Sequence, residues 1–269
     1  MFARLLPSLW LIGMTPPKRH YITRSHRTAR TLVGHRRSEA RDLALATVLA
    51  AIAGAANAGG FFAVGKYTSH MTGYISQLAD NVAILNWQAA MIASLAIGAF
   101  VAGAAFSTVL INWTRHGNHR HQYALALAVQ GFFMFLFCFG GIFTSDLGRL
   151  FSLACLCFIM GMQNATITKI SGARVRTTHA TGMVTDIGIE IGRMIIVGLL
   201  GFPGIAANWP KLKILLSLVF AFLGGGLIGA IGYGHVGFFF SLPLSLILLG
   251  ISLPTLLLET TPAQPRDES

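Results

Sequence analysis

The stretch Ser69-His70-Met71-Thr72-Gly73-Tyr74-Ile75-Ser76-Gln77-Leu78-Ala79 has a similar copy later in the chain, Thr178-His179-Ala180-Thr181-Gly182-Met183-Val184-Thr185-Asp186-Ile187-Gly188. Three of the eleven positions are identical and five more are conservative. A shorter block upstream, 54–58, also has a copy at 161–165, at nearly the same spacing. Chance explains two ordered matches poorly, so the sequence predicts an internal duplication.

The composition of the chain is that of a membrane protein. Of its 269 residues, 54% are hydrophobic and 11% are charged, and soluble domains carry about twice that share of charge. A helix of about 20 apolar residues, rising 1.5 Å per residue, crosses a hydrocarbon core of about 30 Å. This composition excludes an ordinary soluble enzyme and predicts a multipass helical protein. Six apolar runs of suitable length lie at 43–65, 88–113, 122–144, 150–167, 212–233 and 236–258.

Basic residues indicate how these runs cross the membrane, because cytoplasmic loops collect Lys and Arg. With six spans and a cytoplasmic N-terminus, 18 of the 20 Lys and Arg residues lie inside, and Lys66 and Arg149 lie outside. A further apolar patch at 194–206 is the alternative seventh span, which changes the distribution to 15 inside and 5 outside. The sequence therefore favours six spans with both termini cytoplasmic.

The duplication and the span count together predict the fold class. Each half has three spans, and because three is odd, the second half enters from the opposite side. We expect an all-α membrane protein of two inverted three-helix repeats, an architecture in which transporters bind solutes near the bilayer midplane. The predicted parts are a basic cytoplasmic extension at 1–42, repeats at 43–144 and 145–258, and a polar tail at 259–269. We interpret the extension as uncleaved, with Met14 as an alternative start.

Each copy of the motif is too short or too polar to span, so we interpret it as a broken or re-entrant helix that lines a cavity. Hydroxyl groups that precede each copy (Thr68 and Ser69, Thr177 and Thr178) are expected to cap these helices. An ionisable residue within a membrane is a functional candidate, and here the histidine is duplicated. Alternatively, the histidines only stabilise the helix ends, and the two asparagines serve only packing. The predicted substrate path consists of His70, His179, Thr72, Thr181, Gly73, Gly182, Ser69, Thr178, Asn57 and Asn164.

A second group of charged residues follows the second motif. Asp186, Glu190 and Arg193 are spaced i, i+4 and i+7, so they share one helical face. One interpretation is a Glu190–Arg193 ion pair on an interfacial helix, and the other is a gate or an ion-coupling group. Arg174 and Arg176 are expected to mark the cytoplasmic boundary, with attraction of an anionic substrate as the alternative role.

No spacing typical of a metal site or a cofactor site is present, so we expect no metal and no cofactor. Cys138, Cys155 and Cys157 lie inside apolar runs and form no zinc framework. The net charge of +11 comes from residues at the ends of apolar runs, which argues against nucleic acid. The expected partners are the lipid bilayer and a small polar or anionic solute, with a homo-oligomer left open. Transport through a channel or carrier is our first functional hypothesis; a membrane-embedded enzyme and a scaffold or sensor are the alternatives.

The residues at 161–165 and 170–188, with the shorter block around His70, Thr72 and Gly73, resemble the YoaK family of uncharacterised bacterial inner-membrane proteins. The similarity extends over about 40–258. This resemblance implies a multipass inner-membrane protein without an agreed substrate. The chain departs from the family pattern in its long basic N-terminus and in the apolar patch at 194–206.

Overall fold

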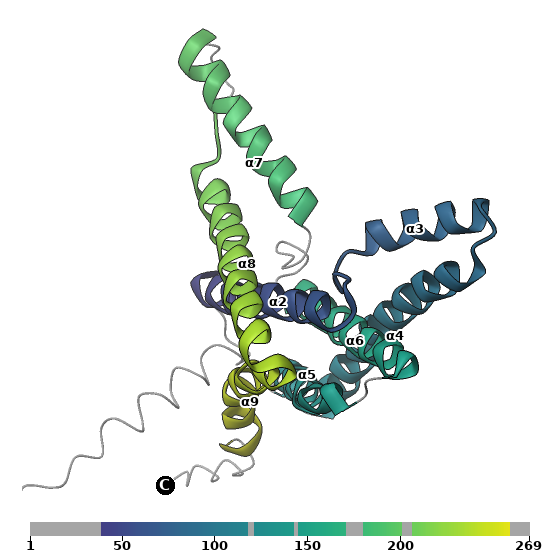
Figure 1. Cartoon of the computed structure of the whole chain (residues 1–269). Coiled ribbons are helices and arrows are strands. Elements are labelled where there is room, and N and C mark those ends of the chain that lie inside the picture. Colours follow the sequence, from purple (N-terminus) through teal and green to yellow (C-terminus); the bar gives the residue numbers. More distant parts are fainter. Residues whose placement is uncertain (1–38, 118–120, 143–144, 171–179, 201–205, 259–269) are drawn as a thin grey trace, which may run out of the picture.

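The computed structural model describes residues 39–117, 121–142, 145–170, 180–200 and 206–258, and this part of the chain is helical and contains no strand (Figure 1). Short helical turns η1, η2 and η3 interrupt or extend the longer helices. The elements are α2 (Glu39–Val64), α3 (Met71–Ala83), α4 (Trp87–Gly117), α5 (Gln122–Phe137), η1 (Cys138–Ile142), α6 (Asp146–Ile170), α7 (Ala180–Ile195), η2 (Ile196–Leu200), α8 (Trp209–Val236), η3 (Gly237–Phe240) and α9 (Ser241–Leu258).

Five helical stretches of the described chain are long and apolar enough to cross a membrane. They are Leu43–Phe62, Trp87–His116, Gln122–Gly140, Asp146–Ile170 and Trp209–Leu257. The last stretch has 49 residues and includes α8, η3 and α9. The described residues of the six predicted apolar runs lie almost entirely in these helical stretches, so the chain is a multipass helical membrane protein in composition and fold.

Two pairs of long helices form the centre of the molecule, and glycine allows their backbones to touch. A Cβ atom on Gly54 of α2 would lie 2.0 Å from the carbonyl oxygen of Phe222 in α8. A Cβ atom on Gly161 of α6 would lie at the same distance from the carbonyl oxygen of Phe100 in α4. Gly54 and Gly161 are equivalent positions of the duplication, because each is the first residue of the shorter repeated block. The α2–α8 and α4–α6 pairs are therefore equivalent.

A second set of contacts repeats this relationship. A Cβ atom on Gly225 would lie 2.0 Å from the Ala51 carbonyl oxygen, and one on Gly103 would lie 2.0 Å from the Phe158 carbonyl oxygen. Ala51 and Phe158 are separated by as many residues as Gly54 and Gly161 in the shorter repeated block. Gly103 and Gly225 are separated by more residues. The larger separation of Gly103 and Gly225 arises because more residues lie between α7 and α8 than between α3 and α4. Close backbone contacts thus recur at positions that the repeated sequence blocks relate to each other.

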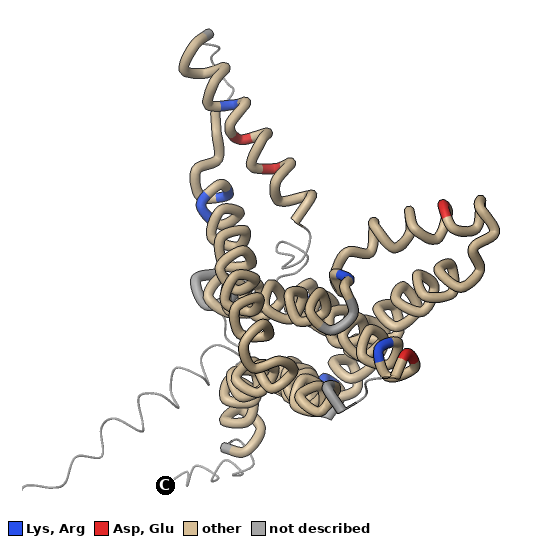
Figure 2. Tube along the Cα trace, viewed as in Figure 1, with Lys and Arg blue, Asp and Glu red and all other residues tan. Residues whose placement is uncertain are grey.

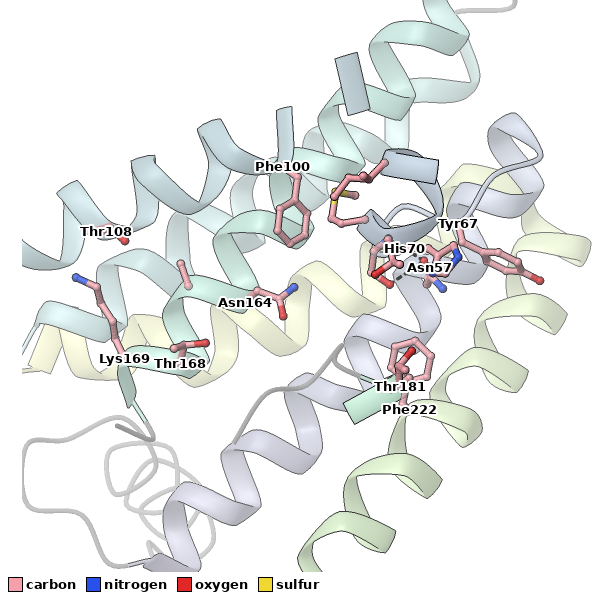
Figure 3. A pocket seen from close by; sticks show the side chains of 16 residues that line it. Asn57, Tyr67, His70, Phe100, Thr108, Asn164, Thr168, Lys169, Thr181 and Phe222 are labelled. Carbon is pink, nitrogen blue, oxygen red and sulfur yellow. Dashed lines mark hydrogen bonds between the residues drawn. The ribbon is translucent and has the colours of Figure 1, made fainter. Parts of the chain in front are cut away.

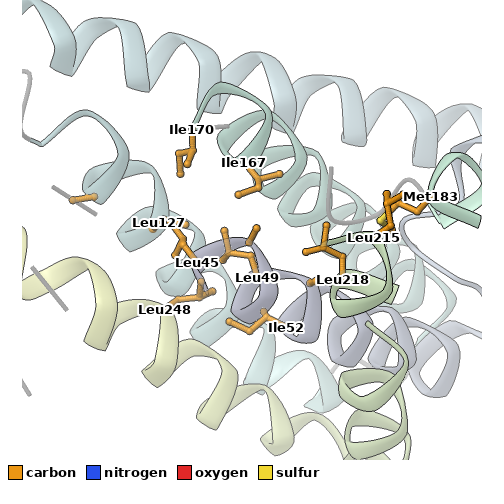
Figure 4. Packing of buried hydrophobic residues seen from close by; sticks show 13 residues of the cluster. Leu45, Leu49, Ile52, Leu127, Ile167, Ile170, Met183, Leu215, Leu218 and Leu248 are labelled. Carbon is orange, nitrogen blue, oxygen red and sulfur yellow. The ribbon is translucent and has the colours of Figure 1, made fainter. Parts of the chain in front are cut away.

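A buried core joins these pairs to α5 and α9 (Figure 4). Leu45 and Leu49 of α2 lie in one cluster with Leu127 of α5 and Leu248 of α9, and all four side chains are fully buried. Polar side chains are also buried here. The Gln163 amide donates a hydrogen bond to the Leu49 carbonyl oxygen and accepts one from the amide of the α5 residue Gln130. Side-chain amides that bond across helices are a common means of association in membranes.

The short helices α3 and α7 each pack along the long helix that follows them, and the two resulting hairpins project from the helical centre in Figure 1. Asn86 accepts a hydrogen bond from the Ala89 N–H at the start of α4, at 3.3 Å. Asn208 accepts one from the Lys211 N–H at the start of α8, at 3.0 Å. In both cases the asparagine accepts from the residue three positions later, so the two hairpins begin their long helices in the same way.

The predicted hydroxyl caps of the first motif are wrong. The helix α3 begins at Met71 with His70 at the N-cap, and no side chain caps it. Thr68 is buried, and Ser69 donates to Asn57 of α2 instead. The reason is that the amide oxygen of Asn57 needs donors inside the helical centre, and the Ser69 hydroxyl supplies one. The corresponding residues of the second motif, Thr177 and Thr178, lie outside the described residues.

Candidate functional site

A cavity of about 930 Å³ lies where both copies of the motif meet the central helices (Figure 3). Thr72, in the first turn of α3, and Thr181, in the first turn of α7, both line it. Asn57 of α2 and Asn164 of α6 line it as well. Residues that are far apart in the sequence thus share one cavity.

Equivalent positions of the two halves recur in the cavity wall. The two asparagines are matched by the shorter block of the duplication, and the two threonines are matched by the longer one. Phe100 of α4 and Phe222 of α8 also line the cavity. The carbonyl groups of these two phenylalanines make the equivalent contacts with Gly161 and Gly54. The cavity is therefore bounded by the same structural elements from both halves.

Asn57 positions the start of the first motif. Its Oδ1 atom accepts a hydrogen bond from the Ser69 backbone N–H and another from the Ser69 hydroxyl, each at 3.1 Å. In the second half, the amide of Asn164 donates to the Met160 carbonyl oxygen one turn earlier in α6, at 2.8 Å. Both amides have structural contacts and line the cavity, so the packing and ligand interpretations of these residues are compatible.

The other predicted path residues fall into three groups. Ser69 and His70 line the cavity together with the residues above. Gly73 and Gly182 do not line it, and a Cβ atom on Gly73 would lie 2.1 Å from the His70 Cδ2 atom, so the imidazole covers this glycine. The remaining path residues, Thr178 and His179, lie outside the described residues, as do Arg174 and Arg176, which were predicted at the cytoplasmic boundary.

Several lining residues were not predicted, and three of them are polar residues at one end of the cavity. Lys169 and Thr168 in the last turn of α6, with Thr108 of α4, form one end of the cavity in Figure 3. The Lys169 ammonium group donates to the Asn112 Oδ1 atom at 3.3 Å. The available signal was the position of Lys169 directly after an apolar run, which we interpreted only as an indicator of orientation.

The charged residues of α7 form a separate cluster against the start of α8, away from the cavity lining (Figure 2). Glu190 has a fully buried side chain that contacts Arg193 at 2.9 Å and Lys211 at 3.9 Å. It also accepts a hydrogen bond from the Asn208 N–H at 2.8 Å. Asp186 pairs with Lys211 at 3.3 Å, with both side chains largely exposed. The predicted Glu190–Arg193 pair is confirmed, and the cluster fixes α7 to α8.

The environment of Glu190 favours its ionised form. The hydrogen bond from the Asn208 N–H is the largest influence, and the positive charges of Arg193 and Lys211 add to it. Together they outweigh the cost of removing the carboxylate from water and lower the pKa of Glu190 below its usual value. At the spacing of the duplicated motifs, the corresponding position of the first half is the neutral Asn81, so this ionic contact belongs to one half.

Comparison with known families agrees with the extent of this helical unit. A family described as a protein of unknown function (DUF1275) matches residues 45–253, which is most of the chain. The chain belongs to the DUF1275 family. No curated protein and no solved structure matches it. The part that matches DUF1275 begins within α2 and ends within α9, so it includes both hairpins and the cavity.

Proposed function

We propose that the protein is a transporter or channel for a small polar solute, and that the solute binds in the cavity between the two halves. The observation that carries this proposal is the pairing of equivalent residues in the cavity wall: Asn57 with Asn164, and Thr72 with Thr181. Transporters built from inverted repeats bind their solutes at the interface of the repeats, where short or broken helices end.

The proposed topology has six spans in two inverted repeats. The stretch Trp209–Leu257, with 49 residues, has a helical length of about 74 Å at 1.5 Å per residue. This length is more than twice the thickness of a hydrocarbon core of about 30 Å, so we assign α8 and α9 to two separate crossings. α3 and α7, with 13 and 16 residues, are too short to cross and form re-entrant or interfacial elements. Within the DUF1275 family, the motif residues favour a grouping with the YoaK proteins.

The enzyme alternative is supported less well by the positions of the carboxylates. A membrane-embedded enzyme that pairs a histidine with a carboxylate needs both groups at one site. Asp186 and Glu190 form ion pairs with residues of α7 and α8, whereas His70 lines the cavity. The described cavity wall therefore offers amides, hydroxyl groups, an imidazole, the Lys169 ammonium group and aromatic rings, which are groups suited to binding.

Flux measurements on purified protein in liposomes test the proposal. We expect uptake of at least one labelled probe among glycerol, acetate and inorganic phosphate above that of empty liposomes. Thr72→Trp and Thr181→Trp, which fill the cavity from opposite halves, should each lower this uptake at least tenfold. Ser76→Trp and Thr185→Trp are matched controls, because they lie about one turn away on the same helices and outside the lining. Absence of uptake, or equal inhibition by the control variants, would overturn the proposal.

A further inference from the structure

Lys169 places a positive charge at one end of the cavity, and the corresponding position of the first half carries no charge. It is the only Lys or Arg in the described lining, and no Asp or Glu of the described lining accompanies it. Its ammonium group contacts a neutral partner, the Asn112 amide oxygen. The described lining thus places no carboxylate beside this ammonium group, and an anion in the cavity would supply the opposite charge.

The polar end of the cavity occurs on one side of the molecule. At the spacing of the shorter repeated block, the equivalents of Thr168 and Lys169 in α2 are Phe61 and Phe62. The Phe61 ring stacks on Tyr67 with a centroid distance of 5.3 Å. The hydroxyl and ammonium groups of α6 are therefore replaced by aromatic rings at the equivalent place in α2.

The other polar groups of the cavity suit an anion as well. Thr72 and Thr181 place hydroxyl donors in the wall at the first turns of α3 and α7. The first N–H groups of a helix lack partners within the helix, and the positive end of its dipole attracts negative charge. Asn57 and Asn164 provide neutral amides beside them. The wall thus contains several groups able to donate hydrogen bonds, and Lys169 adds the one Lys or Arg charge of the described lining.

We propose that the cavity selects a small anion, and that Lys169 is the residue that determines this selectivity. This inference rests on the proposed function and adds the class of solute to it. The competing explanation is structural: a lysine in the last turn of a helix also stabilises the carbonyl end of the helix dipole. The experiment must therefore measure the potential inside the cavity in addition to the stability of the protein.

Charged thiol-reactive reagents report the electrostatic potential inside the cavity, and their use does not require the natural solute to be known. A cysteine is introduced at Thr72, in the lining, after Cys138, Cys155 and Cys157 are replaced by alanine. Its rates of reaction with methanethiosulfonate reagents carrying a sulfonate or a trimethylammonium group are compared. The same ratio is measured for a cysteine at Ser76, outside the lining. We expect the ratio of sulfonate to ammonium rates to be higher at position 72 than at position 76.

Substitutions at Lys169 then test whether its charge is the source of the electrostatic potential at position 72. Lys169→Gln should lower the rate ratio at position 72 by about fivefold or more, because one elementary charge acts with opposite sign on the two reagents. Lys169→Arg should preserve the ratio. Lys213→Gln, which removes a charge from the exposed start of α8, is the matched control and should leave the ratio unchanged.

The possible outcomes separate the two proposals. An unchanged rate ratio in Lys169→Gln, with position 72 still reactive, overturns anion selectivity and leaves the cavity as a solute site. Failure of position 72 to react with either reagent shows a cavity closed to solutes and overturns both proposals. In the flux assay, Lys169→Gln should lower acetate or phosphate uptake and leave any glycerol uptake unchanged. Equal loss of all three would instead indicate a structural role and overturn the selectivity proposal.

Discussion

The backbone of Gly54 in α2 touches the carbonyl group of Phe222 in α8, so closely that a Cβ atom on the glycine would lie 2.0 Å from the Phe222 oxygen. Gly161 and Phe100 repeat this contact between α6 and α4. Both phenylalanines also line the cavity. These two close helix contacts, each between a helix of 43–144 and a helix of 145–258, are therefore adjacent to the proposed solute site.

These contacts predict the effects of adding one methyl group. Gly54→Ala and Gly161→Ala should each destabilise the protein by about 1–3 kcal/mol, because backbone atoms cannot move aside as a side chain can. Gly224→Ala is the matched control, because nothing lies within 4 Å of its added Cβ. Thermal unfolding in detergent measures the differences. If Gly224→Ala lowers the unfolding temperature as much as Gly54→Ala, the close helix contact is not what determines stability.

The bonds between Asn57 and Ser69 predict a graded effect on the first motif. Ser69→Ala removes the hydroxyl donor and should cost about 1 kcal/mol, whereas Asn57→Ala removes the acceptor of both bonds and should cost more. Hydrogen exchange in the first turn of α3 should increase in the same order. Asn81→Ala is the control, because the Asn81 amide donates to Gln77 within α3. Equal exchange in all three variants would contradict a positioning role for Asn57.

Glu190 predicts how the contact between α7 and α8 depends on pH. Its pKa is lower in the folded protein than in the unfolded chain, so the stabilisation is complete above the ordinary carboxyl pKa of about 4.5. It is lost as the pH falls through the lowered folded value. We expect hydrogen exchange in α7, relative to the intrinsic rate, to be constant from pH 7 to about pH 5 and to rise at lower pH.

Substitutions separate Glu190 from its exposed neighbour. Glu190→Ala leaves Arg193 and the Asn208 N–H without their carboxylate, so exchange in α7 should be fast already at pH 7. Asp186→Asn should have a small effect, because the Asp186–Lys211 pair is exposed and such pairs contribute little. A larger effect from Asp186→Asn than from Glu190→Ala would show that the cluster is organised around the other carboxylate.

Tyr74 predicts a substitution that does not harm the protein. Its side chain is buried in the core between α3, α4 and α6, and its hydroxyl has no hydrogen-bond partner among the described residues. Tyr74→Phe should therefore leave stability unchanged or raise it by up to about 1 kcal/mol, since a buried unpaired hydroxyl is costly. Tyr74→Ala is expected to destabilise by several kcal/mol through loss of packing. A marked loss of flux in a stable Tyr74→Phe protein would assign the hydroxyl a role in transport.

The sequence predicted the apolar helices and the paired asparagines and threonines of the cavity wall, because apolar length and internal repetition can both be read from the sequence. It did not predict Phe100 or Phe222, because a phenylalanine in an apolar run carries no sign that it borders a cavity. The partnership of Glu190 with Lys211 also required the structure, since it depends on how α7 folds back along α8. The hydroxyl caps failed as a prediction because a tertiary acceptor, Asn57, took the donor that the local rule assigned to the helix.

Cross-linking between the two motifs tests the central claim, that one cavity is shared by both halves. Cysteines replace Thr72 and Thr181 in a protein without native cysteines, and a protease site is inserted between α5 and α6. Treatment with a short bifunctional methanethiosulfonate reagent should keep the two fragments together after cleavage until a reductant is added. Cysteines at Ser76 and Thr185 should give separate fragments. Separate fragments for the 72/181 pair, or equal cross-linking of both pairs, would contradict the shared cavity.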